Sequence, residues 1–192
     1  MTFFHPTPAM LLAFVLVGEL VLMRSRLSGD ASRQADRGSL RIIMGVIFAS
    51  VGLAWLAGRA FPQARVADAL TLEWMYVAGL ALFVAGVSLR WYAIAWLGRS
   101  FTYDVAVDAD QRVIDTGPYR HVRHPAYTGS LLSFIGVGLC GGNLVALGVL
   151  VTPIAWAFLH RIAIEEAALT AALGSRYSDY ASRTRRLLPF VY

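Results

Sequence analysis

Four long hydrophobic stretches, separated by segments that hold most of the charges, dominate the chain. The first three are residues 8–23, 42–57 and 74–89, and the third continues past Arg90 to Gly98. Each approaches the ~20 residues that an α-helix needs to cross a bilayer. A helix over the whole of the third stretch would extend beyond the membrane, because a helix rises ~1.5 Å per residue.

The fourth stretch, residues 124–160, contains no carboxylate and no arginine and is too long for one span. Gly141, Gly142 and Asn143 in its middle are a turn signal. The pattern predicts a hairpin of two short helices, residues 126–140 and 144–160. The predicted fold is an all-α integral membrane protein with about five transmembrane helices, three of them in residues 1–97 and the hairpin in residues 98–192.

Composition supports a membrane protein. The 192 residues are 57% hydrophobic and 15% charged, with a mean hydropathy of +0.58, whereas soluble domains are about one quarter charged. No positive charge precedes the first stretch, so we expect a span there and not a cleaved signal peptide. The single cysteine, Cys140, excludes an intrachain disulfide, and no His, Cys and carboxylate cluster has metal-site spacing, so no metal is expected.

The arginines predict an orientation. A net charge of +5 can indicate a nucleic-acid partner, but the arginines lie between apolar stretches, so we expect none. Residues 24–41 hold five arginines and residues 98–123 and 176–192 four each, whereas only Arg59 and Arg65 lie between the second and third stretches. Cytoplasmic loops carry the excess of basic residues. We therefore expect the N-terminus outside and the C-terminus inside. Termini on opposite sides need an odd number of spans, which is reached only if the fourth stretch forms two spans, as a hairpin.

Two polar segments are candidates for chemistry. Residues 115–127 combine a Gly-Pro turn with Arg123, His124 and a proline suited to a first helical turn. A helix that starts there would direct unpaired N–H groups at an anionic ligand, although a basic loop before a helix explains the segment equally well. Arg161, Glu165 and Glu166 follow the last stretch. Arg161 and Glu165 share a helix face, and are either an exposed ion pair or, at membrane depth, a functional one.

One motif is rejected. Residues 136–141 fit the GxGxxG dinucleotide pattern, but this match lies in an uncharged membrane stretch without the strand and acidic residue that the pattern needs. Glycines there favour close helix packing.

A family resemblance rests on four pieces in order. They are Arg123-His124-Pro125-Ala126-Tyr127 after Gly117-Pro118-Tyr119, then Glu165-Glu166, then the helix with Leu173-Gly174, Tyr177 and Tyr180, and a closing Arg186-Leu187-Leu188-Pro189-Phe190. Together they resemble the isoprenylcysteine carboxyl methyltransferases, in the form of a prokaryotic member, over residues 98–192.

The resemblance implies a cytoplasmic pocket for S-adenosyl-L-methionine, formed by the C-terminal half. Carried over residue by residue, it implies these cofactor contacts: Asp104, Gln111, Val113, Ile114, Tyr119, His124, Tyr127 and Glu165. It makes Arg161 the substrate-side arginine. The implied substrate is a lipophilic or prenylated molecule that enters from the bilayer, most simply the carboxylate of an isoprenylcysteine.

The chemistry of Arg161 agrees with a carboxylate acceptor. A carboxylate with a pKa near ~4 is already ionised at neutral pH, so it needs orientation and not a general base. An arginine fork can supply that orientation. A phospholipid amine or a thiol would instead lose a proton, for which His121, His124 or a tyrosine are candidates. A membrane sterol or enone reductase using NADPH and a non-catalytic scaffold remain alternatives.

Two charges inside the predicted spans stay open. Glu19 is either a partner of Arg90 or reaches the interface. Arg90 either lines a substrate entrance or snorkels to the membrane surface. The sequence leaves the oligomeric state open, because helix-packing glycines suit a monomer or a dimer.

Overall fold

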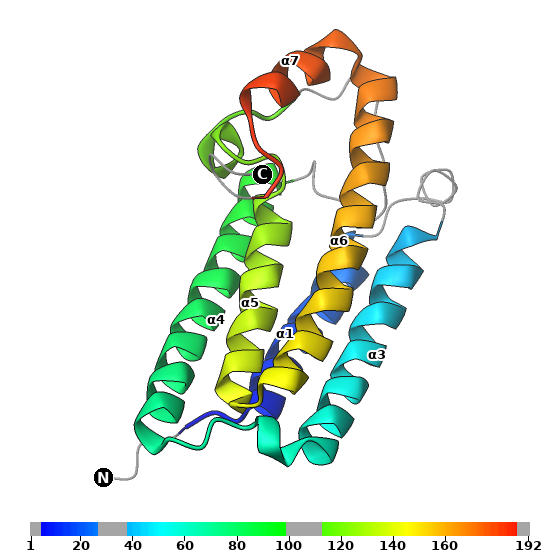
Figure 1. Ribbon diagram of the computed structural model, residues 1–192. Helices are drawn as coiled ribbons and strands as arrows, with labels where there is room; N and C mark the ends of the chain where they lie inside the picture. The colour runs from blue at the N-terminus through cyan, green and yellow to red at the C-terminus, as the bar shows by residue number, and fades with distance from the viewer. Residues whose placement is uncertain (1–4, 27–37, 99–112, 188–192) are drawn as a thin grey trace.

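The computed structural model describes residues 5–26, 38–98 and 113–187, and nearly all of them are helical (Figure 1). The helices are α1 (Pro8–Arg26), α3 (Ser39–Ala60), α4 (Ala69–Leu97), α5 (Pro125–Gly141), α6 (Leu144–Leu173) and α7 (Ser175–Arg183), with the 3-10 turns η1 (Pro62–Ala64) and η3 (Gly117–Arg120). The hydrophobic stretches therefore form helices, as predicted. The short tail helix α7 is also observed.

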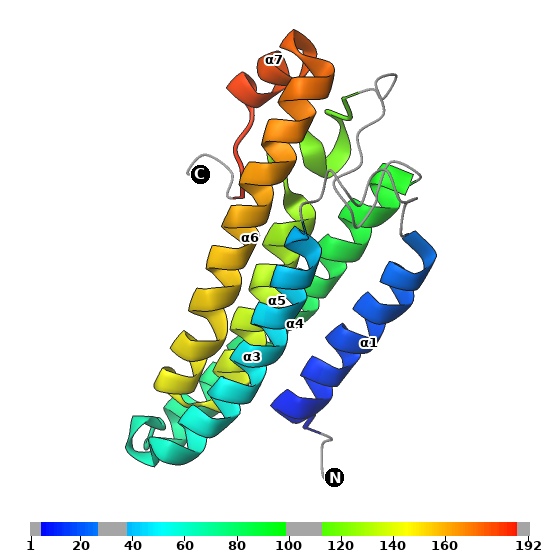
Figure 2. The ribbon, with the colours of Figure 1, turned by 90° about the vertical axis from the view of Figure 1, so that its right-hand side faces the viewer.

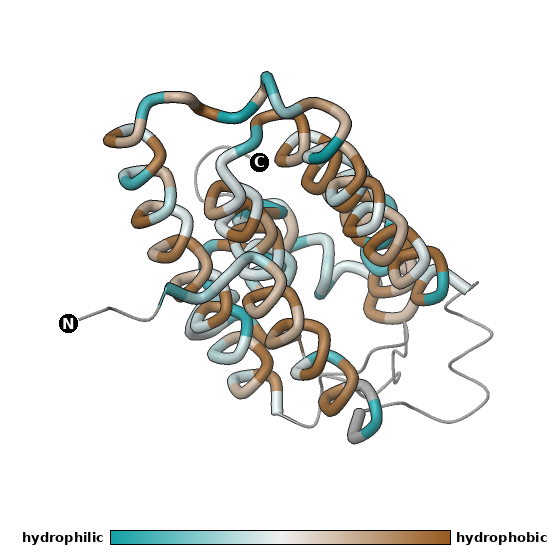
Figure 3. The backbone as a smooth tube through the Cα atoms, turned by 90° about the horizontal axis from the view of Figure 1, so that it is seen from below, coloured by the Kyte–Doolittle hydropathy of each residue, from teal (hydrophilic) through white to brown (hydrophobic). Residues whose placement is uncertain are grey.

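Three of the helices, α3, α4 and α6, are long and apolar enough to cross a membrane. Two shorter apolar helical segments, Pro8–Leu22 and Pro125–Gly141, accompany them. Figure 3 shows hydrophobic residues along most of the length of the helices. That all five cross the bilayer stays a prediction.

The turn between α5 and α6 lies where the sequence predicts it. Gly142 has a φ of 66°, which favours glycine. The side chain of Asn143 accepts a hydrogen bond from the N–H of Ala146, at 2.9 Å, and so caps α6. Its amide nitrogen also donates to the carbonyl of Phe61, at 2.9 Å. The same asparagine thus starts α6 and fixes the α3–α4 connection.

Glycines bring α4 and α5 together. A Cβ added at Gly86 would lie 2.6 Å from the carbonyl oxygen of Gly129, and one at Gly79 would lie 2.7 Å from that of Gly136. Distances this short mean that the two backbones touch, as small residues permit in membrane helices. Gly136 belongs to the rejected GxGxxG match, so its role in this contact is helix packing, as predicted.

The helix ends and the connections between helices lie at two opposite ends of the bundle (Figures 1 and 2). The start of α1, the α3–α4 connection and the α5–α6 turn lie at one end, and α7 with the start of α5 lies at the other. With 30 residues, α6 is about 45 Å long, whereas the hydrocarbon core is ~30 Å thick. We expect its C-terminal part, which carries the charged residues Glu165 and Glu166, to project from the membrane.

Candidate active site

Two segments distant in sequence pair at the projecting end. The N–H of Arg123 donates to the carbonyl of Arg185 at 2.7 Å, and that of His124 to the carbonyl of Arg186 at 3.0 Å. The N–H of Arg185 in turn donates to the carbonyl of His121 at 3.1 Å. This short ladder holds the tail after α7 against the segment that leads into α5.

Glu166 lies at the centre of the polar cluster. Its Oε1 accepts from Nε of Arg123 at 2.7 Å and lies 3.2 Å from Nε2 of His124, while its Oε2 accepts from Nε of Arg186 at 2.9 Å. Its side chain is 13% exposed. One carboxylate of α6 thus binds the start of α5 and the tail together.

The cluster controls the ionisation of Glu166, which lies beyond the predicted span that ends at His160. Burial alone would raise its pKa, but hydrogen bonds from His124 and Arg123, and their charge, lower the pKa to about 2. The carboxylate therefore stays ionised at any physiological pH.

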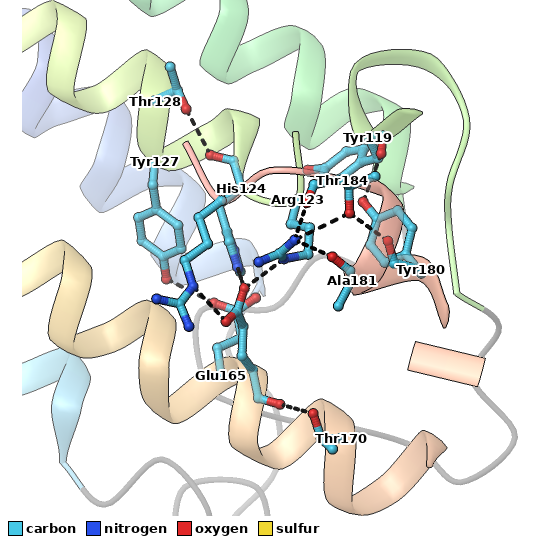
Figure 4. A network of polar contacts seen from close by, with 12 residues as sticks. Tyr119, Arg123, His124, Tyr127, Thr128, Glu165, Thr170, Tyr180, Ala181 and Thr184 are labelled. Atoms are coloured by element: carbon cyan, nitrogen blue, oxygen red, sulfur yellow. Dashed lines mark hydrogen bonds and ion pairs between the residues drawn. The ribbon is translucent and has the colours of Figure 1, made fainter. Parts of the chain in front are cut away.

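Arg123 also caps α7. Its Nη1 donates to the carbonyls of Ala181, at 2.9 Å, and Thr184 (Figure 4). A cation at the end of a helix satisfies carbonyls that have no partner within the helix. Arg123 is thus a structural link between α5, α6 and α7.

Glu165, the neighbour of Glu166, faces a different partner. Its Oε2 accepts from the hydroxyl of Tyr127 at 3.2 Å (Figure 4). The ring of Tyr127 also contacts those of His124 and Phe158, with centroids 5.8 Å and 5.4 Å apart. A carboxylate offers about four acceptor positions, so Tyr127 occupies only part of the capacity of Glu165.

Arg161 lies one helical turn before Glu165 and is buried, at 3% exposure. Its Nη1 donates to the hydroxyl of Ser39 at the start of α3, which is also buried. Its low exposure argues against the solvent-exposed ion pair considered from the sequence. Burial of a charged guanidinium costs free energy unless hydrogen bonds or opposite charges compensate it. Its contact with Ser39 is one such compensating hydrogen bond.

The tyrosines of the region are built into the scaffold. The hydroxyl of Tyr119 donates to the carbonyl of Ala93 at 3.3 Å, and the hydroxyl of Tyr180 donates to the carbonyl of Tyr119 at 2.7 Å. Burial raises the pKa of Tyr119, Tyr177 and Tyr180, so their phenols stay neutral. The buried hydroxyl of Tyr177 has no hydrogen-bond partner within residues 5–26, 38–98 and 113–187.

The structure brings together only some of the residues implied for the cofactor. Tyr127, Glu165 and His124 form one group, and His124 is turned to Glu166. Val113 packs with Tyr177 and Tyr180, whereas Ile114 packs with Tyr119 in a separate apolar cluster. Asp104 and Gln111 lie outside the described residues.

The roles of Glu166 and Arg123 as the links of the cluster were not predicted from the sequence. Both were part of the motifs, but neither was assigned a role. The signal available was the adjacent pair of carboxylates: neighbouring residues on a helix point about 100° apart, so two carboxylates in a row serve two different partners.

Glu19 is the partner of Arg90. Nε and Nη2 of Arg90 donate to the two carboxylate oxygens of Glu19, and Nη1 donates to the carbonyl of Ala126 at 3.3 Å. This bidentate pair ties α1 to α4 and to the first turn of α5. The expectation of a Glu19–Arg90 pair is confirmed, and a role in substrate entry stays a prediction.

Within the described ranges, no group of His, Cys, Asp and Glu could hold a metal ion.

Comparisons with known proteins point to one family. The family model described as the isoprenylcysteine carboxyl methyltransferase (ICMT) family matches residues 79–171. Protein-S-isoprenylcysteine O-methyltransferase B of Arabidopsis thaliana is 35% identical over 124 residues, 62% of this chain and 61% of that protein. The Schizosaccharomyces pombe protein-S-isoprenylcysteine O-methyltransferase is 31% identical over 115 residues, 58% of this chain and 48% of that protein.

A solved structure is also similar. The eukaryotic intramembrane Ras methyltransferase ICMT matches with a TM-score of 0.62 and 26% identity, over 77% of this chain and 52% of that chain. This chain therefore spans about half to three fifths of the length of the relatives named here. The two curated relatives come from a plant and a fission yeast, so they do not support the expectation of a prokaryotic member.

Proposed function

We propose that this chain, whose residues 79–171 match the model of the isoprenylcysteine carboxyl methyltransferase family, is a member of that family and methylates a lipophilic carboxylic acid at the membrane with S-adenosyl-L-methionine. The acceptor that the names of its relatives favour is the carboxylate of an isoprenylcysteine. The chain is an integral membrane protein. Its C-terminus and the Glu166 cluster face the cytoplasm in this proposal, and the N-terminus lies outside.

The observation that carries the proposal is the position of Arg161 relative to Glu165 and Tyr127. These groups come from α5 and α6, within the family match, and lie where α6 leaves the membrane. A buried arginine next to an apolar bundle suits an acceptor whose carboxylate is polar and whose tail is lipophilic. The lipid tail would remain among the helices while the carboxylate meets Arg161.

Arg161 has the chemistry for orienting the acceptor. A guanidinium can hold a carboxylate through two parallel hydrogen bonds, which fixes the direction of the attacking oxygen. The carboxylate is already ionised at neutral pH, so no side chain has to remove a proton. Burial of Arg161 excludes water from this contact, which strengthens it.

The residues present fit S-adenosyl-L-methionine, which supplies a methyl group activated by a sulfonium. That cofactor carries cationic and hydroxyl groups, and Glu165 is an acceptor with spare positions that Tyr127 orients. The buried hydroxyl of Tyr177 is a further polar atom that a ligand could satisfy. We assign direct cofactor contacts to Tyr127 and Glu165, with Asp104, Gln111, Val113 and Ile114 as further candidates.

His124 and Tyr119 have different parts in this proposal. Both already use a polar group within the protein, His124 towards Glu166 and Tyr119 towards Ala93. Their contribution to the cofactor is therefore a ring surface, or the positioning of Tyr127.

Two other enzyme classes make contrasting predictions. A phospholipid N-methyltransferase or thiol S-methyltransferase would require a base close to the acceptor. An NADPH-dependent sterol or enone reductase would bind NADPH and ignore S-adenosylhomocysteine.

The test is calorimetric titration of the detergent-purified protein with S-adenosylhomocysteine and, in parallel, with NADPH. We expect micromolar binding of S-adenosylhomocysteine that Glu165→Ala abolishes and that Glu73→Ala, an exposed carboxylate at the other end of the bundle, leaves intact. Binding of NADPH alone would overturn the proposal. A second step supplies labelled S-adenosyl-L-methionine with an S-prenylated N-acetylcysteine or its amide, and transfer to the acid alone identifies the carboxylate as acceptor.

A further inference from the structure

The end of the bundle opposite Glu166 contains a cavity that the proposed reaction does not use. It has a volume of about 640 Å³ and lies among α1, α3, α5 and α6. Leu12, Trp55 and Leu150 contribute to its mostly apolar wall. Pockets that hold small ligands have volumes of about 300–1,000 Å³, so this one is large enough for part of a lipid.

Glycines are among the residues that line this cavity. Gly52 on α3 and Gly141 on α5 line the cavity, and a Cβ added at either would meet no atom within 4 Å. An added Cβ therefore meets no steric clash at either position. Because both glycines line the cavity, these are the positions at which a larger side chain is best suited to reduce its volume.

Arg59 and Arg65 supply the positive charge of the cavity wall. The guanidinium carbon of Arg59 lies 5.1 Å from the centre of the Trp55 ring, in a cation–π contact. The backbone of Arg65 pairs with Asn143 at the α5–α6 turn, which anchors this part of the α3–α4 connection.

No carboxylate lines the cavity among the described residues. The acidic residue next along the chain, Asp68, accepts a hydrogen bond from the N–H of Thr71 and caps α4. The charged residues of the cavity lining are thus both basic, and the rest of the lining is mostly apolar.

We propose that this cavity binds an anionic phospholipid, with the phosphate at Arg59 and Arg65 and an acyl chain in the apolar hollow. Guanidinium groups bind phosphate oxygens through paired hydrogen bonds. Trp55 lines the cavity and is 62% exposed, and tryptophan favours the membrane interface, where a headgroup would lie.

The net charge of the headgroup distinguishes an anionic phospholipid from other lipids. A phosphatidylcholine offers the same acyl chains and a phosphate, but it also brings a quaternary ammonium, for which the cavity wall has no carboxylate. Glycerol phosphate offers the headgroup without the chain. The binding site should therefore prefer phosphatidylglycerol to either.

The experiment measures the melting temperature of the delipidated protein in neutral detergent, titrated with phosphatidylglycerol, with phosphatidylcholine of the same acyl chains, or with glycerol phosphate. We expect stabilisation by phosphatidylglycerol with an apparent affinity about tenfold above that for phosphatidylcholine, and none by glycerol phosphate. The double variant Arg59→Gln, Arg65→Gln should bind phosphatidylglycerol and phosphatidylcholine with equal apparent affinity.

Two glycine variants test the hollow. Gly52→Leu should weaken binding of both phospholipids, whereas Gly45→Leu, seven residues away on the same helix and outside the cavity, should change neither. Equal affinities for the two lipids in the unmodified protein, or a preference that survives loss of both arginines, would overturn the proposal. A lipid-free dimer by light scattering that takes up no phospholipid would replace it with a second copy of the chain as the occupant.

Discussion

Arg123 and Glu166 lie 43 positions apart in the sequence, and Nε of Arg123 donates to Oε1 of Glu166 at 2.7 Å. The pair joins the start of α5 to the projecting part of α6, and the rest of the Arg123 guanidinium holds the end of α7. The most charged part of the site is thus a support for three helices. The groups proposed to meet the ligands, Arg161, Glu165 and Tyr127, lie beside this support.

Loss of this pair should destabilise the protein more than loss of a surface pair. We expect Arg123→Gln to lower stability by about 3 kcal/mol, because it leaves a largely buried carboxylate and helix carbonyls without a partner. The control is Arg183→Gln, whose pair with Asp115 has side chains 65% and 43% exposed and should cost at most ~1 kcal/mol. Thermal unfolding in detergent measures both, and equal losses would show that Arg123 is not a support.

Arg161→Ala should separate turnover from cofactor binding. Without the guanidinium the acceptor carboxylate is no longer oriented, and we expect kcat/KM to fall by about 10²-fold or more. Affinity for S-adenosylhomocysteine should change by less than about twofold, because Glu165 and Tyr127 carry that contact in the proposed site. Arg176→Ala, an exposed arginine of α7, is the matched control. Loss of cofactor binding in Arg161→Ala would assign this arginine to the cofactor instead.

Stability should depend on Glu166 at acid pH. Its pKa is about 2 in the folded protein, against an ordinary value of 4.5. A depressed pKa contributes stability that is fully present above 4.5 and is lost as the pH falls towards 2. The gap in melting temperature between the unmodified protein and Glu166→Gln should therefore shrink over this window. A gap that stays constant from pH 7 to pH 3 would contradict the role given to this carboxylate.

Packing of α4 on α5 should depend on the absence of side chains at the glycine contacts. Gly86→Ala would place its Cβ 2.6 Å from backbone atoms of α5, so the helices must separate, at a cost of about 1–3 kcal/mol. Gly45→Ala faces open space and should stabilise α3 by up to ~1 kcal/mol through helix propensity. If the free energy of unfolding changes in the same direction in both variants, the close contact of α4 with α5 is refuted.

The helices could be predicted from the sequence because a membrane imposes strong limits on composition and length. The α5–α6 turn was also predictable, since Gly142 adopts a left-handed conformation that few other residues accept. The helix ends were less predictable. The helix α6 continues to Leu173, well beyond the predicted end at residue 160, because no hydrophobic signal marks where a helix stops in water.

The site was predictable as a set of residues and not as a geometry. Glu165 and Glu166 are equivalent in the sequence, and only the direction of each side chain on α6 determines which one meets Tyr127 and which one meets Arg123. The contact of Arg123 with Thr184 spans 61 positions. A spacing pattern cannot report a contact of this kind, which depends on how α7 folds back.

The pairing of residues 121–124 with Arg185 and Arg186 also constrains the order of events during biosynthesis. The helical hairpin can enter the membrane while the ribosome is still adding residues, but the ladder beside it has no second strand until Arg185 and Arg186 have been made. At ~5–20 residues per second, this leaves an interval on the order of seconds in which Glu166 has been synthesised but lacks its partner Arg186. The polar cluster around Glu166 can therefore be completed only after Arg186 has been synthesised.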